Sequence, residues 1–139
     1  MNFKKLVALS ILLGCFSAGR SQTINIQADT IVWQVNGMTD LIGNVTVPYQ
    51  CKFVTRASQD IDWVQGDGDV VTHFSITGAN GDWSNPSEDG SVTYNISGDG
   101  VSGQLSLSRS SSGLSAHLQL NGGAYEINHS YPVLSYEKR

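Results

Sequence analysis

A polar segment in the middle of the chain carries the residues with the clearest binding chemistry. It spans 81–90 and reads Gly-Asp-Trp-Ser-Asn-Pro-Ser-Glu-Asp-Gly. An exposed tryptophan beside amides and carboxylates can stack on a sugar ring or anchor a partner protein. We therefore take Asp82, Trp83 and Asn85 as candidate binding residues. The alternative is that this tryptophan folds over the end of the core.

A second candidate surface comes from polar residues that alternate with apolar ones in the C-terminal half. Neutral hydroxyl and amide groups of this kind suit a glycan, a cell-wall polymer or another strand, and we take Asn95, His117 and Gln119 as candidate binding residues. A plain solvated face is the alternative. Only one of the twelve residues is a carboxylate: Thr93, Asn95, Ser97, Gln104, Ser106, Ser108, Ser115, His117, Gln119, Glu126, Asn128 and Ser130.

The sequence offers no recognisable catalytic or metal-binding pattern. Its three histidines are dispersed, and neither His-Glu-x-x-His nor Cys-x-x-Cys spacing is present. Turns such as 66–69 carry the oxygen ligands that calcium prefers, but Asp-Gly is also ordinary turn chemistry. We therefore expect no enzyme, no metal and no cofactor. The net charge of -4 also excludes the basic surface that a nucleic-acid partner requires.

Residues 1–21 have the layout of a secretory signal peptide. Two lysines precede an apolar run over 6–13, and small residues follow it. Small residues at the third and first positions before Gln22 predict cleavage there, which makes the protein secreted, periplasmic or attached to the cell surface. The alternative is a lipoprotein signal over 1–14 with Cys15 lipidated, because the residues around it resemble a bacterial lipobox. A lipid there would be the only contact with a membrane.

Residues 22–139 form one domain of β-hairpins, in which Asn-Gly and Asp-Gly turns separate alternating apolar and polar residues. Strands over about 91–98, 101–109, 113–121 and 124–131 then share one apolar face. Two-residue loops at 99–100 and 121–122, with an even-length loop through 110–111, predict these partners: Tyr94 with Leu105, Leu107 with Leu114, and Leu118 with Tyr125.

The N-terminal half shows the same alternation more weakly, including a first alternating run over 24–28. Trp33 and Cys51 share parity with apolar neighbours and are expected in the core, and so is His129, with a hydrogen-bond partner. His73 is expected outside. The count predicts an all-β fold: an antiparallel, meander-rich β-sandwich or small β-barrel of about eight or nine strands.

These features favour a non-catalytic interaction module that binds a protein or a glycan. Two other classes remain open. A small barrel could carry an apolar ligand inside, which requires a closed sheet with an internal cavity. A small outer-membrane barrel would instead turn its apolar side to lipid.

Overall fold

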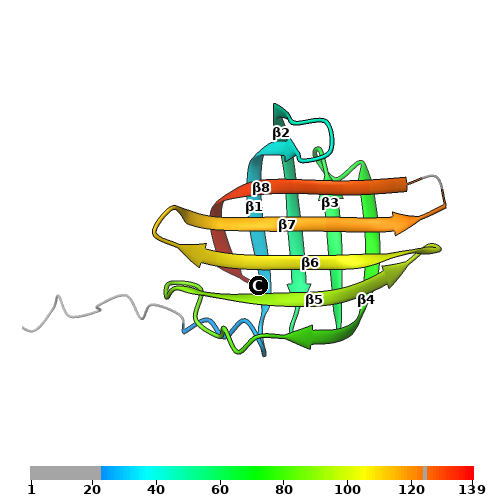
Figure 1. The fold of residues 1–139 in the computed structure, drawn as a ribbon. Coiled ribbons are helices and arrows are strands. Elements are labelled where there is room, and N and C mark those ends of the chain that lie inside the picture. The colour runs from blue at the N-terminus through cyan, green and yellow to red at the C-terminus, as the bar shows by residue number, and fades with distance from the viewer. Residues whose placement is uncertain (1–22, 124) are drawn as a thin grey trace, which may run out of the picture.

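The computed structural model describes residues 23–123 and 125–139, which form one closed antiparallel barrel (Figure 1). Each strand pairs with the next along the chain, and the first pairs with the last. Strands β1–β4 lie behind β5–β8 and cross them, and β8 bends from the front layer to the back to meet β1. The strands are β1 (Thr30–Asp40), β2 (Val45–Arg56), β3 (Asp60–Gln65), β4 (Val70–Asn80), β5 (Gly90–Gly98), β6 (Val101–Ser110), β7 (Gly113–Gly122) and β8 (Tyr125–Lys138).

The all-β, antiparallel prediction is confirmed, and the choice between sandwich and barrel is decided by the pairing of β1 with β8. The expected first strand over 24–28 is absent: residues 26–28 form a turn, and Asp29 accepts a hydrogen bond from the Asn25 amide across it at 2.8 Å. The two candidate signal peptides and Cys15 lie outside the described residues. No helix in the described part of the chain is long and apolar enough to cross a membrane.

The predicted pairing around Asp99-Gly100 is confirmed, because Tyr94 lies opposite Leu105. Asp99 and Gly100 both have positive φ, at 51° and 76°, as a two-residue hairpin turn requires.

The other two predicted pairings of the meander are wrong in register. Leu107 lies opposite Ala116 instead of Leu114. Leu118 lies opposite His129 instead of Tyr125. Each slip moves the partner by an even number of residues, so every side chain keeps its predicted face.

The barrel interior is a single apolar core. Trp33 and Phe53 are fully buried, and Cys51 is 4% exposed, so the sequence-based placement of Trp33 and Cys51 is confirmed. Polar residues alternate with these and face solvent. A smaller outer cluster of Val32, Val54 and Val64 is buried on β1–β3.

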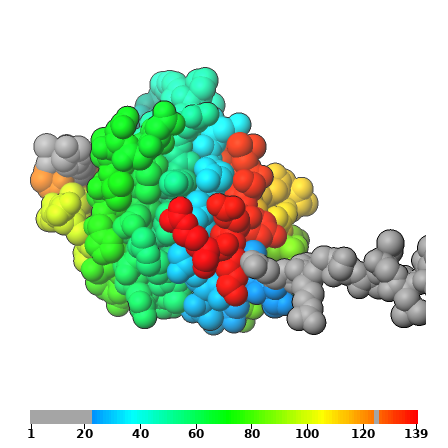
Figure 2. Space-filling model, turned by 180° about the vertical axis from the view of Figure 1, so that it is seen from behind, coloured from blue at the N-terminus to red at the C-terminus, as the bar shows by residue number. Residues whose placement is uncertain are grey.

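One end of the barrel is sealed by two segments that are not strands. The N-terminal segment places Ile26 in the core, where its amide donates to the Ser84 carbonyl at 2.8 Å. The β4–β5 connection places Trp83 beside Trp33, with ring centroids 6.1 Å apart. The C-terminal residues, red in Figure 2, lie against β1, where the Arg139 amide donates to the Thr30 carbonyl.

Candidate functional site

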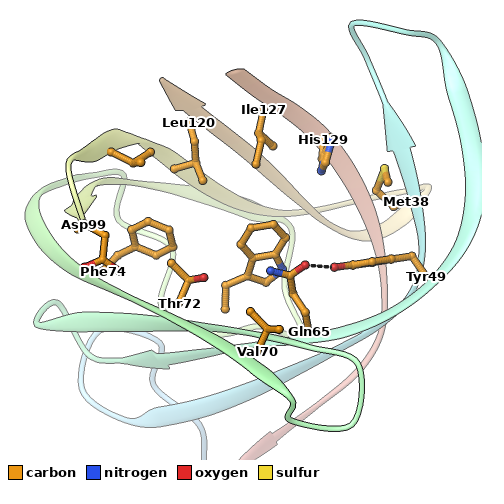
Figure 3. A pocket seen from close by; sticks show the side chains of 13 residues that line it. Met38, Tyr49, Gln65, Val70, Thr72, Phe74, Asp99, Leu120, Ile127 and His129 are labelled. Carbon is orange, nitrogen blue, oxygen red and sulfur yellow. Dashed lines mark hydrogen bonds between the residues drawn. The ribbon is translucent and has the colours of Figure 1, made fainter. Parts of the chain in front are cut away.

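The opposite end of the barrel is hollow. A cavity of about 570 Å³ lies between the strand ends that the β1–β2, β3–β4, β5–β6 and β7–β8 hairpins join (Figure 3). It reaches the surface, because its lining includes the exposed Val70 and Asp99. The residues that line it are Met38, Tyr49, Trp63, Gln65, Val70, Thr72, Phe74, Gly98, Asp99, Val101, Leu120, Ile127 and His129.

The lining is mostly apolar, because the inward positions of all eight strands converge here. Phe74 and Leu120 are buried, while Met38, Val101 and Ile127 are partly buried and pack against the core. These side chains give the cavity apolar walls with a few polar groups between them, the usual composition of a site for a small organic molecule.

Two polar side chains of the lining are held against each other. The Tyr49 hydroxyl donates to the Gln65 carboxamide oxygen, which fixes the orientation of that amide (Figure 3). Burial raises the pKa of the Tyr49 hydroxyl, and the nearby Cys51 acts in the same direction. This hydroxyl is therefore protonated at neutral pH and acts as a donor.

His129 is the titratable base of the cavity. Its Nδ1 lies 2.9 Å from the Tyr131 hydroxyl, which confirms the predicted inward histidine with a hydrogen-bond partner. Burial lowers the pKa of His129, although the charge of Asp40 opposes the shift. Burial also raises the pKa of Tyr131. His129 therefore lies uncharged at the cavity wall at neutral pH, beside the neutral, fully buried Tyr131.

Trp63 closes the inner wall of the cavity. It is 6% exposed and stacks on Phe53 with an angle of 11° between the rings. Its Nε1 is the one buried side-chain polar atom of the described residues without a hydrogen-bond partner. The Cys51 thiol lies beside this indole; burial raises the pKa of the thiol to about 11, and the indole lowers it. The indole N–H is therefore enclosed by the protein beside a weak sulfur acceptor, and a molecule in the cavity does not reach it.

Exposed apolar side chains surround the entrance. Leu41, Ile42 and Val45 belong to the β1–β2 hairpin and are 46–57% exposed. Val70 and Val71 begin β4 and are 53% and 55% exposed. Both hairpins lie at the open end, so an apolar molecule would meet apolar side chains before it enters.

The segment selected first in the sequence lies at the sealed end. Trp83 is 5% exposed and its Nε1 donates to the Glu88 carbonyl at 2.8 Å, so it folds over the core, as the alternative reading expected. Asp82 and Asn85 are exposed. The Asn85 carboxamide oxygen accepts from the Ser87 amide and hydroxyl at 3.0 and 2.7 Å, which is local turn geometry.

The second set lies where the alternation predicted, on the outer face of β5–β8. Gln119 and Asn95 are exposed, and Asn95 accepts from Gln104 at 3.0 Å. His117 is half-buried, and its Nε2 lies 2.5 Å from the Asn128 oxygen. The structure thus places these three side chains on one polar face, away from the Trp83 loop, and occupies two of them with neighbouring side chains.

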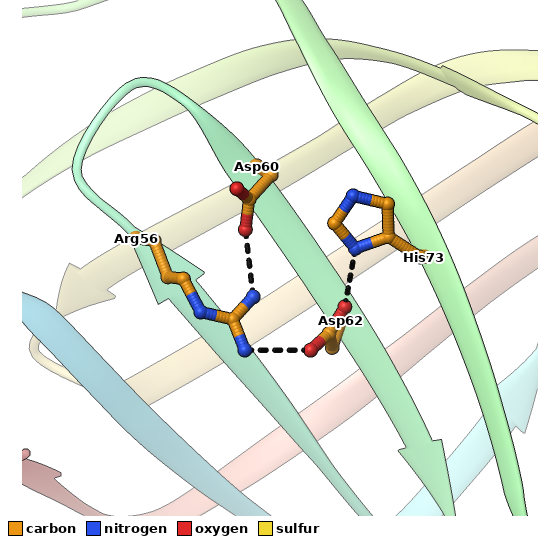
Figure 4. Close-up of polar contacts among 4 residues, drawn as sticks. All are labelled: Arg56, Asp60, Asp62 and His73. Atoms are coloured by element: carbon orange, nitrogen blue, oxygen red, sulfur yellow. Dashed lines mark hydrogen bonds and ion pairs between the residues drawn. The ribbon is translucent and has the colours of Figure 1, made fainter.

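The outer face of β2–β4 carries an ionic cluster of Arg56, Asp60, Asp62 and His73 (Figure 4). The Arg56 guanidinium bridges Asp60 and Asp62 at 2.6 and 2.7 Å, and Asp62 also lies 2.7 Å from His73. His73 is 59% exposed, as its parity predicted. No nucleophile forms a hydrogen bond with this His–Asp pair among the described residues. Residues 23–123 and 125–139 hold no group of three or more side chains that could ligate a metal ion.

Sequence reasoning did not single out the cavity residues, although it left an internal cavity open as an alternative. One signal was present: Tyr49, Thr72 and His129 are polar residues at positions that alternate with apolar ones. All three line the cavity. Polar groups at inward positions near one end of a barrel therefore marked the site.

No protein-family model, no curated protein and no solved structure matches this chain.

Proposed function

We propose that this protein binds a small apolar molecule inside its barrel without transforming it. The observation that supports the proposal is the contrast between the two ends: Trp83 and Ile26 fill one, and the other holds a cavity of about 570 Å³ with apolar walls. Ligand sites usually have about 300–1,000 Å³. Replacement of water by an apolar molecule in a cavity with apolar walls is favourable, because it removes apolar surface from water.

Uptake of N-phenyl-1-naphthylamine tests this proposal, since this uncharged dye emits strongly only in apolar surroundings. We expect saturable binding with one dye molecule per chain. Absence of saturable uptake by the folded protein would contradict the proposal.

Two substitutions on β4 separate the cavity from the surface. Thr72 lines the cavity, whereas Ser75 is exposed on the other face of the strand, away from the entrance. Thr72→Trp should weaken dye binding by ~10-fold or more, about 1.4 kcal/mol, because the indole would occupy the space that the dye needs. Ser75→Trp adds the same side chain outside and should bind like the wild type. Equal binding by both variants would place the dye outside the cavity.

The interaction module expected from the sequence is the second candidate, and one observation favours it. The outer face of β5–β8 carries exposed Gln119 and Asn95 and almost no charge. Glycan-array binding that is lost in Gln119→Ala, but kept in the turn variant Ser112→Ala, would support this function. An array with no signal would leave it without support.

Export is a proposal that concerns the segment outside the described residues. We infer that the mature chain begins at Gln22, with lipidated Cys15 as the alternative. The mass of the purified mature protein separates the two, since acyl chains add to the second form only.

The inward direction of the apolar side chains gives no support to an outer-membrane barrel, which turns them toward lipid.

A further inference from the structure

We propose that the cavity selects an uncharged apolar molecule that carries a hydrogen-bond-accepting oxygen, such as an ester or a ketone. The inference rests on the proposed binding function and adds the chemical class of the ligand. Two independent features support it: a free hydrogen-bond donor in the wall, and the charge at the entrance.

The wall offers a donor that the protein does not use. The Gln65 oxygen accepts from Tyr49, so its amide nitrogen is left as a donor, and Figure 3 shows that nitrogen directed toward the middle of the cavity. Gln65 is partly buried and lines the cavity, so a ligand oxygen could accept from this nitrogen away from bulk water.

The entrance repels an anion. Asp67, Asp69 and Asp99 are exposed in the β3–β4 and β5–β6 turns, and Glu126 is exposed at the start of β8. Asp40 ends β1 at the same side. A fatty-acid carboxylate would approach several charges of its own sign.

One cation of the described residues lies near this end. Lys52, on the outer face of β2, lines an outer hollow together with Asp67, so it offsets one of the entrance carboxylates. Arg56 lies at the sealed end of the same strand and is already paired with two aspartates. Arg109 lies toward the sealed end, where its Nε donates to the Pro86 carbonyl at 2.6 Å. Lys138 and Arg139 end the chain beside β1 at that end. Inside the cavity His129 is uncharged, because burial lowers its pKa.

Four ligands with the same ten-carbon chain test the inference by displacement of the naphthylamine dye from the full-length protein. They are methyl decanoate, decanoate, decylamine and decane. Methyl decanoate should displace the dye at a concentration about fivefold lower than decane does, since one hydrogen bond contributes ~0.5–1.5 kcal/mol. Decanoate should be the weakest ligand with a polar group.

Two variants assign these preferences to residues. The double variant Y49F/Q65L removes the amide N–H without leaving the Tyr49 hydroxyl unpaired, so it should abolish the advantage of methyl decanoate over decane. The double variant D67N/D69N should strengthen decanoate and leave methyl decanoate unchanged. Stronger binding of decanoate or decylamine than of methyl decanoate, or a full ester advantage in Y49F/Q65L, would overturn the inference while dye uptake still supports the cavity. Failure of the dye itself to bind would instead contradict the proposed function.

Discussion

Removal of the Trp83 indole is the sharpest test of how this barrel is closed. Trp83 is 5% exposed and contacts Trp33, with centroids 6.1 Å apart, and its Nε1 donates to the Glu88 carbonyl at 2.8 Å. Gly90 lies against the same ring, since a Cβ there would come within 2.3 Å of Trp83 Cδ1. Trp83→Ala would therefore leave a void at the sealed end.

The expected cost follows from these contacts. Truncation of a buried tryptophan to alanine costs ~3–5 kcal/mol. The tilted aromatic pair and the hydrogen bond account for about 1 kcal/mol each of that sum. A domain of this size is stable by only ~5–15 kcal/mol, so the variant should lose a large fraction of its free energy of unfolding. With a urea m value near 2 kcal/mol/M, the midpoint should fall by about 1.5–2.5 M.

Urea unfolding followed by circular dichroism measures this shift. Trp83→Phe should lose only about 1 kcal/mol, because it keeps an aromatic ring and loses the hydrogen bond. Ser84→Ala, next along the chain and exposed, should stay within ~0.5 kcal/mol of the wild type. If Trp83→Ala behaves like Ser84→Ala, the indole does not seal the barrel and our account of the closed end is wrong.

Three further predictions concern stability and reactivity. Thr55→Val should lower the free energy of unfolding in urea by ~1–3 kcal/mol, because fully buried Thr55 accepts from Trp33 Nε1 at 3.0 Å. Thr55→Ser is the control, since it keeps that acceptor. Burial raises the pKa of Asp62, but its contacts with Arg56 and His73 (Figure 4) lower the pKa more, to below the ordinary 3.8 of an aspartate. The stability from this carboxylate is therefore present above pH ~3.8 and lost as pH falls further, so Asp62→Asn should flatten the fall of the urea midpoint below pH ~4, and parallel curves would refute this. Burial raises the pKa of Cys51 to about 11. In protein that consists of residues 22–139, the folded thiol should therefore react with a disulfide reagent at pH 8 roughly 100-fold more slowly than the unfolded thiol. Equal rates would show that the thiolate is exposed.

The strands of the C-terminal half could be predicted from sequence because neighbouring residues along the chain specify them. Asp99-Gly100 tolerates the two positive φ angles of a tight turn, and the apolar alternation on both sides agrees with it. The β7–β8 register could not be fixed in the same way. Gly122 and Gly123 both have positive φ, so the Asn-Gly-Gly run offers adjacent positions for a turn, and the alternation accepts any even shift between them.

The role of Trp83 could not be decided from its neighbours. A tryptophan in a polar loop has the same local sequence whether it points to solvent or folds inward. Its ring neighbour Trp33, and Ile26, which bonds to the adjacent Ser84, lie far away along the chain. Barrel closure is non-local in the same sense. Pairing of Ile31 with Lys138 joins the two ends of the domain, and no local pattern specifies it.

The hollow end follows from the lengths of the connections. At the sealed end the β4–β5 connection spans 81–89 and the N-terminal segment spans 23–29, so each is long enough to carry side chains such as Trp83 and Ile26 into the barrel. At the other end the β5–β6 turn is only Asp99-Gly100, and the β1–β2 and β3–β4 turns span 41–44 and 66–69. Turns this short reverse the chain but cannot fold over the opening, so only the strand residues fill that half. Where these are small or polar, as Thr72 is, the space stays open. The same alternation thus packs one half of the barrel and leaves a binding cavity in the other.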